Sequence, residues 1–239
     1  MSSVLESIDP QRTIGAIAAT LPGATAVFRR HKLDFCCGGN VPLAQAAQDK
    51  GLDLQDLLAQ LQALQHDDDA EGVPSGPAAL IDHILARYHE VHRQQLPELE
   101  RMARRVEAVH RDHPAVPAGL AQLLEHMQSE LLDHMAKEEQ VLFPVLRIGG
   151  HPMARHPIAM MRHEHVAHGQ VLDRLDALTG EMRPPADACN TWRALYVGLG
   201  QLKDDLMMHI HLENNVLFPQ FEPAAPGCGC AGEGAGSCG

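Results

Sequence analysis

The sequence has almost no segment that alternates apolar and polar residues as a strand would, and no long apolar run. A membrane-spanning helix needs roughly 20 consecutive apolar residues, and no stretch approaches that length. These absences predict an all-α fold without a membrane partner. Its 239 residues are enough for one large helical domain and one small one.

Cationic residues are also in deficit. Lys and Arg number 19 against 31 Asp and Glu, giving a formal net charge of −12. This balance argues against nucleic acid and anionic membrane surfaces as partners, because both carry negative charge. Residues 1–12, MSSVLESIDPQR, lack the basic and apolar regions of a secretory leader, so we expect no export.

The six cysteines are placed unsuitably for a disulfide framework. Cys36 and Cys37 are adjacent, while Cys228, Cys230 and Cys238 lie in a Gly-rich tail to which we assign no role. Disulfide frameworks are typical of small secreted proteins, and nothing in the sequence indicates secretion. We therefore predict a reducing, cytoplasmic environment.

Histidine, in contrast, is abundant, with 16 residues, and two of them open a repeated motif. The sequence HMAKEEQVLFP begins at His134, and HIHLENNVLFP begins at His209. Each copy places a Glu, Glu138 or Glu213, four residues after its His. Side chains at positions i and i+4 are neighbours on a helix, so each copy directs an imidazole and a carboxylate to one place.

Both His/Glu pairs lie on apolar faces of their predicted helices. Around them, apolar residues recur at steps of three and four: Leu120, Leu124, Met127, Leu131, Val141 and Val145 in one helix, and Leu195, Leu199, Leu202, Leu206 and Val216 in the other. Burying an imidazole and a carboxylate without partners is costly. A metal ion shared between helices would remove that cost.

Composition divides the chain into four parts. We expect a helical module at 1–65, an acidic, Gly- and Pro-containing linker at 66–77, a bundle at 78–221 and a flexible Gly/Cys-rich tail at 222–239. Breaks rich in Pro and Gly separate four bundle helices, at about 78–110, 116–148, 156–179 and 187–220. Because short connections make consecutive helices antiparallel, we predict an up-down-up-down four-helix bundle.

In the first module, helices are expected from Pro22 towards Leu33, from about Pro42 to Lys50, and after a cap at Asp53. Cys36 and Cys37 lie in a turn before the second of these helices. A helix N-terminus lowers the pKa of a nearby thiol, so we expect a redox or transfer role for the two cysteines. The alternative is that both are small buried hydrophobic residues.

The helix lengths bring several polar groups to one level of the bundle. His89 and His165 lie about 15 Å from the starts of their helices, and the two His/Glu pairs lie about 15 Å before the ends of theirs. In an antiparallel bundle these heights coincide. Spacing alone does not separate His89 from His92, or His165 from His168, because each pair shares a helix face.

Four imidazoles and two carboxylates suit iron, manganese or zinc. A structural zinc site has four ligands, usually including Cys, so six ligands on four helices fit two metal ions better, with both Glu bridging. Ferritin-like sites use Glu-x-x-His and contain more Glu. A site with more His and fewer carboxylates is the haemerythrin type.

Residues from about 12 to 221 resemble the iron–sulfur cluster repair di-iron proteins, which join an N-terminal Cys-Cys-Gly-Gly module to a haemerythrin-like domain. The segments that carry the resemblance are LPGATAVFRRHKLDFCCGG, RYHEVHRQQLPEL, HMAKEEQVLFP, MRHEHVAHG and DDLMMHIHLENNVLFP. Carried over position by position, the family's metal ligands fall on His89, His134, Glu138, His165, His209 and Glu213.

The resemblance implies two non-haem iron ions with carboxylate and oxo or hydroxo bridges. It also implies a homodimeric cytoplasmic stress protein that repairs iron–sulfur clusters damaged by nitric oxide or peroxide, with the damaged cluster proteins as partners. Nitric oxide binding or reduction is a further activity that it suggests. Two alternatives stay open: a haemerythrin-like carrier or sensor of O₂ or nitric oxide, and a metal buffer with surplus His and a Cys-containing tail.

Other polar residues near the motifs have weaker assignments. Glu130 precedes His134 by four residues and is a candidate to support a ligand or relay protons, the alternative being a surface carboxylate. Glu139 is not an expected ligand, so replacing it by Leu should leave the two metal ions coupled, unlike the same change at Glu138. If His92 and His168 are not ligands themselves, they are expected to support the ligands from the inward helix face. His83, His163 and His211 are expected to face solvent.

Overall fold

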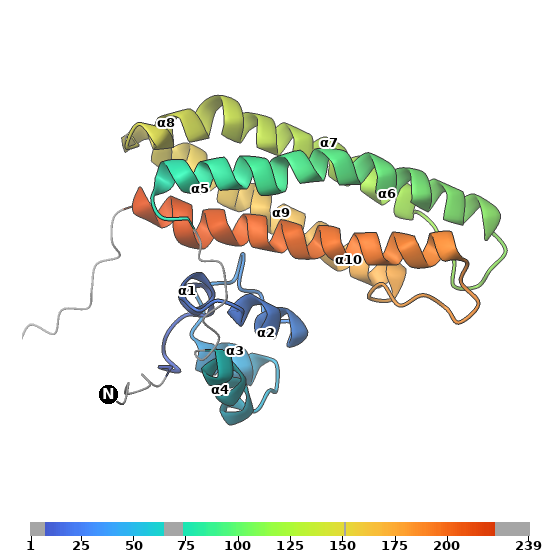
Figure 1. Ribbon diagram of the computed structural model, residues 1–239, viewed down its shortest axis with the longest axis horizontal. Helices are drawn as coiled ribbons and strands as arrows, with labels where there is room; N and C mark the ends of the chain where they lie inside the picture. Colours follow the sequence, from blue (N-terminus) through green and yellow to red (C-terminus); the bar gives the residue numbers. More distant parts are fainter. Residues whose placement is uncertain (1–7, 65–73, 151, 223–239) are drawn as a thin grey trace, which may run out of the picture.

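A computed structural model describes residues 8–64, 74–150 and 152–222, and these residues form helices joined by short turns, with no strand among them. The predicted all-α fold is therefore confirmed. Figure 1 shows a long helical bundle with a small group of helices beside it. Within the described residues, no helix is long and apolar enough to cross a membrane.

Four long helical segments make up the bundle. In chain order their elements are α5 (Pro77–Ile84), η2 (Leu85–His89) and α6 (Glu90–Val109); α7 (Leu120–Lys137), η3 (Glu138–Leu142) and α8 (Phe143–Arg147); η4 (Pro152–Ala154) and α9 (Arg155–Thr179); and α10 (Asn190–His211), η5 (Leu212–Leu217) and η6 (Phe218–Gln220). Helix α6 contacts α7 and α10, and α9 contacts the same two helices. Consecutive segments run in opposite directions, as predicted (Figure 1).

Two separate apolar clusters fill the bundle interior. One occupies the end near α5 and α8 and includes Ile84, Phe143 and Phe218. The other fills the longer half between α6, α7, α9 and α10, and includes Leu131 and Leu206. In every segment the sequence-predicted ligands lie where the residues of one cluster give way to those of the other, so a polar layer lies between two apolar ones.

Three of the segments contain a π-helical stretch at this polar layer: η2, η3 and η5. In two of them the backbone carbonyl of a predicted ligand Glu accepts a hydrogen bond from the backbone N–H five residues further on. The N–H of Phe143 donates to Glu138, and that of Phe218 donates to Glu213. π-Helical turns are rare and are frequent at functional sites, because the wider turn re-aims side chains. The sequence pattern did not predict them.

The π-helical stretch explains an error in the predicted apolar stripe. A regular helix would bury Val141 and Val145 after Glu138, but Val141 is 56% exposed and Val145 is half-buried. Leu142 and Leu146 are buried instead. The wider turn contains one extra residue, so the buried positions beyond it shift by one.

Residues 8–64 of the N-terminal module form four helices: α1 (Ile14–Thr20), α2 (Ala24–Arg30), α3 (Leu43–Asp49) and α4 (Leu54–Ala63). The sequence reading named the last three but missed α1, whose Thr13 side chain caps it by accepting from the Ala16 backbone. Helix α2 begins at Ala24 rather than Pro22, because Gly23 has a left-handed φ of 81°. Asp53 caps α4 as expected.

The module contacts the bundle at the turn that carries the two cysteines. The side-chain amides of Asn214 and Asn215 donate to the Cys36 carbonyl at 3.0 and 3.3 Å. A Cβ on Gly39 would lie 2.6 Å from the Phe35 carbonyl oxygen and 2.7 Å from Asn215 Oδ1, so only glycine fits there. The turn is therefore held closely against η5.

This contact overturns the predicted exposure of His211. Its side chain is 1% exposed, its ring lies 5.3 Å from that of Phe35, and its Nδ1 lies 3.2 Å from Asn215 Nδ2. The residue does lie off the inward face of α10, but the N-terminal module covers that face. His163 is exposed as predicted, and His83 is half-buried.

Domain boundaries remain a prediction. Residues 66–73 of the expected linker lie outside the described residues, as does the tail from 223 with its three cysteines. We expect residues 74–222 alone to keep the bundle, because both apolar clusters have residues from all four of its segments. We also expect a melting temperature at least about 5 °C lower, because the face that carries His211 would lose its cover.

Circular dichroism of this fragment and the full chain tests that expectation. A fragment that is unfolded at 25 °C would show that the N-terminal module is needed to complete the bundle core.

Candidate metal centre

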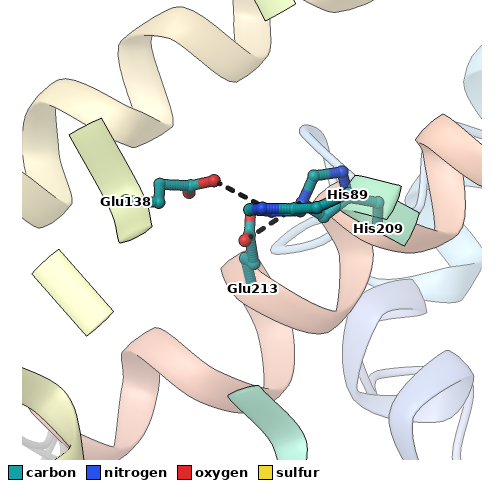
Figure 2. Close-up of side chains that lie close together, drawn as sticks. All are labelled: His89, Glu138, His209 and Glu213. Atoms are coloured by element: carbon teal, nitrogen blue, oxygen red, sulfur yellow. Dashed lines mark hydrogen bonds and ion pairs between the residues drawn. The ribbon is translucent and has the colours of Figure 1, made fainter. Parts of the chain in front are cut away.

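Six side chains from four helical segments meet in the polar layer of the bundle. Their sources are η2 for His89, α7 for His134, η3 for Glu138, α9 for His165, α10 for His209 and η5 for Glu213. Each is no more than 1% exposed. Figure 2 shows four of them pointing toward one another.

The six residues form two groups that share both carboxylates. One group is His89, Glu138, His209 and Glu213; the other is His134, Glu138, His165 and Glu213. Within each group, the ligand atoms all lie within 4.8 Å of one another. This is the arrangement expected for two neighbouring metal ions bridged by two carboxylates.

Each carboxylate has one oxygen near each group. Glu138 lies 3.4 Å from Nε2 of His89 and 3.4 Å from Nε2 of His134, through different oxygens. Glu213 likewise lies 3.2 Å from His209 Nε2 and 3.0 Å from His165 Nε2. All four imidazoles therefore present Nε2 to the shared carboxylates.

Three of these imidazoles are oriented by acceptors on their other nitrogen. Nδ1–H of His89 donates to Glu139 at 2.7 Å, that of His134 to Glu164 at 2.8 Å, and that of His165 to Asn214 at 2.9 Å. Because Nδ1 carries the proton, Nε2 of a neutral ring has a free lone pair. Such acceptors typically fix ring orientation and tautomer at metal sites.

The geometry of the facing nitrogens fits a cation. His134 Nε2 and His165 Nε2 lie 3.1 Å apart, as do His89 Nε2 and His209 Nε2. Burial lowers the pKa of His89 to about 4 and also lowers that of His134, so neither is protonated at neutral pH. In the His134/His165 pair both rings have an acceptor on Nδ1, so two Nε2 lone pairs face each other and repel unless a cation lies between the nitrogens.

The carboxylates lead to the same conclusion. Both oxygens of Glu138 are buried, and no described residue donates a hydrogen bond to them. Burial raises the pKa of Glu138 well above its usual range, and the neighbouring Glu213 raises it further. A cation at each group would favour the ionised form and supply the missing partner. The residues present therefore fit two metal ions.

Two more buried histidines lie beside the groups without belonging to either. The ring of His92 is 5.5 Å from that of His209, and the ring of His168 is 4.9 Å from that of His134. Both nitrogens of His92 and Nε2 of His168 lack a hydrogen-bond partner among the described residues. Burial lowers the pKa of His92 to about 2 and that of His168 to about 4.

The hypothesis that Glu130 lies on the inward stripe is wrong, because its side chain is exposed. Met127, Leu131 and Glu138 define the inward direction of this segment. At 100° per residue, Glu130 lies about 80° from the centre of that direction, although it is four residues from His134. Glu130 is therefore a surface carboxylate and a suitable control residue.

Glu139 belongs to neither group of ligand atoms, but it contacts one of the proposed ligands. Its carboxylate accepts from His89 and from Arg93, whose Nη2 lies 2.5 Å away. Glu164 plays the same part for His134, and Lys137 donates to it at 2.8 Å. Sequence reasoning missed both acceptors. The available signal was that each Glu is adjacent to a predicted ligand, Glu138 or His165.

Cys36 and Cys37 lie in a turn before α3, as the sequence predicted. Residues 38–42 separate Cys37 from Leu43, the first residue of α3, so the thiols lie beyond the first turn, where the helix dipole acts. The contact with Cys37 raises the pKa of the Cys36 thiol, and burial raises it further, so the predicted thiolate at Cys36 is wrong for the metal-free protein. The two sulfurs are 3.8 Å apart and form no disulfide.

Removing one bridging carboxylate should remove a metal ion. We expect Glu138→Leu and Glu213→Leu each to lower the metal content from two ions per chain to one or fewer, because both groups lose a ligand. Glu130→Leu is the matched control and should retain both ions. Metal analysis of the anaerobically purified proteins, with Mössbauer spectroscopy of iron-loaded samples, measures this. Equal metal content in all three variants would contradict the bridging geometry.

Comparisons with known proteins agree with this structure. Residues 80–221 match the family model of the haemerythrin HHE cation binding domain, and residues 10–65 match that of the ScdA_N domain, described as a domain of unknown function. The chain is 45% identical to a probable iron–sulfur cluster repair protein of Haemophilus influenzae, over 88% of this chain and 96% of the relative.

Two further relatives are iron–sulfur cluster repair proteins YtfE, one from Yersinia pseudotuberculosis and one from Yersinia pestis. Each is 50% identical to this chain, over 87% of this chain and 96% of its own length. The haemerythrin match covers more than half of the chain, and the relatives are covered almost completely. The chain therefore belongs to the haemerythrin HHE family and, within it, to the group of iron–sulfur cluster repair proteins.

Proposed function

We propose that this protein holds two iron ions in its bundle and repairs iron–sulfur clusters damaged by nitrosative or oxidative stress, by donating iron to them. The observation that carries the proposal is the buried set of four His and two shared Glu, 3.0–3.4 Å from one another in each His/Glu contact. The relatives named as repair proteins support it.

In this proposal His89 and His209 hold one ion, His134 and His165 hold the other, and Glu138 and Glu213 bridge them. Imidazole and carboxylate ligands suit iron, and two ferrous ions carry more positive charge than two carboxylates neutralise. The pair would therefore bind an oxo or hydroxo bridge or a diatomic ligand such as nitric oxide or O₂.

The surrounding residues keep the ligands in place and exclude water. Glu139, Glu164 and Asn214 hold three imidazoles with Nε2 turned inward. The apolar layers on both sides of the site close it within the bundle. A ligand set held this firmly has low access to bulk solvent, so transfer of iron needs a neighbouring group that can reach the surface.

Cys36 and Cys37 are the groups that we assign to transfer or to contact with the damaged client protein. The Cys37 thiol donates to the backbone carbonyl of His165 at 3.5 Å, so it lies beside a proposed iron ligand. Thiolates are soft ligands that accept iron. Cys37 is half-buried and lines a surface pocket, which supports contact with a client.

The family resemblance further supports a cytoplasmic homodimer that responds to nitric oxide, with nitric oxide bound or reduced at the iron pair. The alternative function is a carrier or sensor of O₂ or nitric oxide that does not repair clusters. A carrier would exchange its gas reversibly and keep both irons, whereas a donor loses iron to its client. Anaerobic incubation of iron-loaded protein with a damaged aconitase-type dehydratase distinguishes the two.

The cysteines provide a sharper test of the repair function. We expect the double variant Cys36→Ser/Cys37→Ser to retain its iron and bind nitric oxide, because no proposed iron ligand is changed, but to reactivate the dehydratase at least about tenfold more slowly. Cys189→Ser, which alters a half-buried cysteine in contact with His110, is the matched control and should reactivate normally.

Unchanged reactivation by the double variant would mean that the bundle alone donates iron. If the double variant lost both its iron and its reactivating activity, the cysteine turn would be needed to hold the metal centre.

A further inference from the structure

A second cluster of metal-ligating groups lies outside the bundle centre, in the turn between α2 and α3. The Asp34 carboxylate and the Cys36 and Cys37 thiols place one ligand atom each within 4.8 Å of the others. The Cys36 thiol lies 3.2 Å from Asp34 Oδ1, and the two sulfurs lie 3.8 Å apart. We propose that Asp34, Cys36 and Cys37 form an exchangeable binding site for a thiophilic divalent metal ion.

The sulfur–sulfur distance favours chelation of one ion. A tetrahedral ion with metal–sulfur bonds of about 2.3 Å separates its two sulfur ligands by about 3.8 Å. A disulfide would need the sulfurs about 2.05 Å apart. The observed sulfur–sulfur distance of 3.8 Å therefore matches the separation around a shared ion.

Several contacts hold the turn in place and still leave its three ligand groups able to bind a metal ion. The Cys37 backbone N–H donates to Asp34 Oδ1 at 2.9 Å, which fixes the carboxylate beside the thiols and leaves Oδ2 available. Asn214 and Asn215 hold the Cys36 carbonyl from the bundle side. A Cβ on Gly38 would lie 3.0 Å from the Asp34 carbonyl oxygen, so the chain turns tightly there.

The site is open to solvent on one side. All three residues line a pocket of about 750 Å³ between the N-terminal module and the bundle. Asp34 is exposed, Cys37 is half-buried and Cys36 is buried. Three protein ligands and an open fourth position are typical of sites that exchange a ligand, whereas closed four-ligand sites are structural.

Two thiolates and a carboxylate favour borderline-soft ions such as ferrous iron or zinc. Binding such an ion would release the two thiol protons to solvent and change no oxidation state. In the proposed repair reaction the ion is the ferrous cargo. Metal binding at this site would explain how the cysteines transfer iron, and only this role as a transfer site rests on the proposed function.

One side chain connects this site with the bundle centre. Asn214 donates through Nδ2 to the Cys36 carbonyl at 3.0 Å and accepts through Oδ1 from His165 Nδ1–H at 2.9 Å. The proposed surface site and a proposed iron ligand therefore share one hydrogen-bonded residue. An ion that enters or leaves the bundle centre past His165 would reach these thiols directly.

Cobalt(II) is a suitable probe, because thiolate ligands give it a strong charge-transfer absorption. The test uses full-length protein with its bundle centre loaded with iron and with Cys228, Cys230 and Cys238 replaced by Ser, so that the tail thiols do not contribute. We expect one further Co²⁺ per chain, with the thiolate absorption. Cys36→Ser/Cys37→Ser should abolish it, and Asp34→Asn should weaken binding at least about tenfold. Cys189→Ser should leave it unchanged.

X-ray absorption of bound Co²⁺ provides a second measurement that needs no substitution at the site, and it should count two sulfur ligands. No thiolate absorption, fewer than two sulfurs, or binding that survives the double Ser substitution would overturn the proposal. The repair assay tests the proposed function separately. If the cysteines bind cobalt but the double Ser variant repairs clusters normally, the cysteines have no role in transfer. If repair needs the cysteines but no cobalt binds to them, the metal site is wrong.

Discussion

The arrangement of the bundle depends on four imidazole nitrogens and two carboxylates that face one another in an apolar interior. Nε2 atoms in each facing pair lie 3.1 Å apart, and the oxygens of Glu138 have no hydrogen-bond donor in the described part of the chain. Without cations, this layer is a cluster of desolvated and mutually repelling groups, which opposes packing of the four segments. With cations, the same layer joins all four segments. Metal binding and bundle stability are therefore coupled, because ions that bind only the folded chain stabilise it.

The remaining structure supports this layer in three ways. Apolar clusters on both sides exclude water, which strengthens the electrostatic attraction between ligands and cations. π-Helical turns lie at His89, Glu138 and Glu213, and the extra residue in each turn changes which neighbouring residues are buried, as at Leu142 and Leu146. Glu139, Glu164 and Asn214 fix the imidazole rings, and Asn214 also ties the layer to the N-terminal module. The N-terminal module matches a separate sequence family, but it also contacts a residue that orients a proposed metal ligand.

Much of this could be predicted from sequence, because its main signals are local. Helical periodicity located the four segments, and the repeated His-x-x-x-Glu motif together with helix length brought four imidazoles and two carboxylates to one level. The family resemblance was needed to choose His89 over His92 and His165 over His168. What could not be predicted depends on tertiary contacts or on departures from regular helix geometry. The burial of His211 requires the module, the shift from Val141 to Leu142 requires a π-helical turn, and the contact of Glu139 with His89 requires both helices in place. The pKa of Cys36 depends on Cys37 and on burial, which the helix-dipole argument did not include.

The central claim is that two iron ions lie in this layer and share Glu138 and Glu213. Anomalous diffraction at the iron absorption edge, from crystals of the iron-loaded protein, tests it most directly because it locates iron without assuming the ligands. The account predicts two peaks inside the bundle, one contacted by His89 and His209 and the other by His134 and His165, with both carboxylates between them. A single peak, or two peaks that do not share the carboxylates, would contradict it.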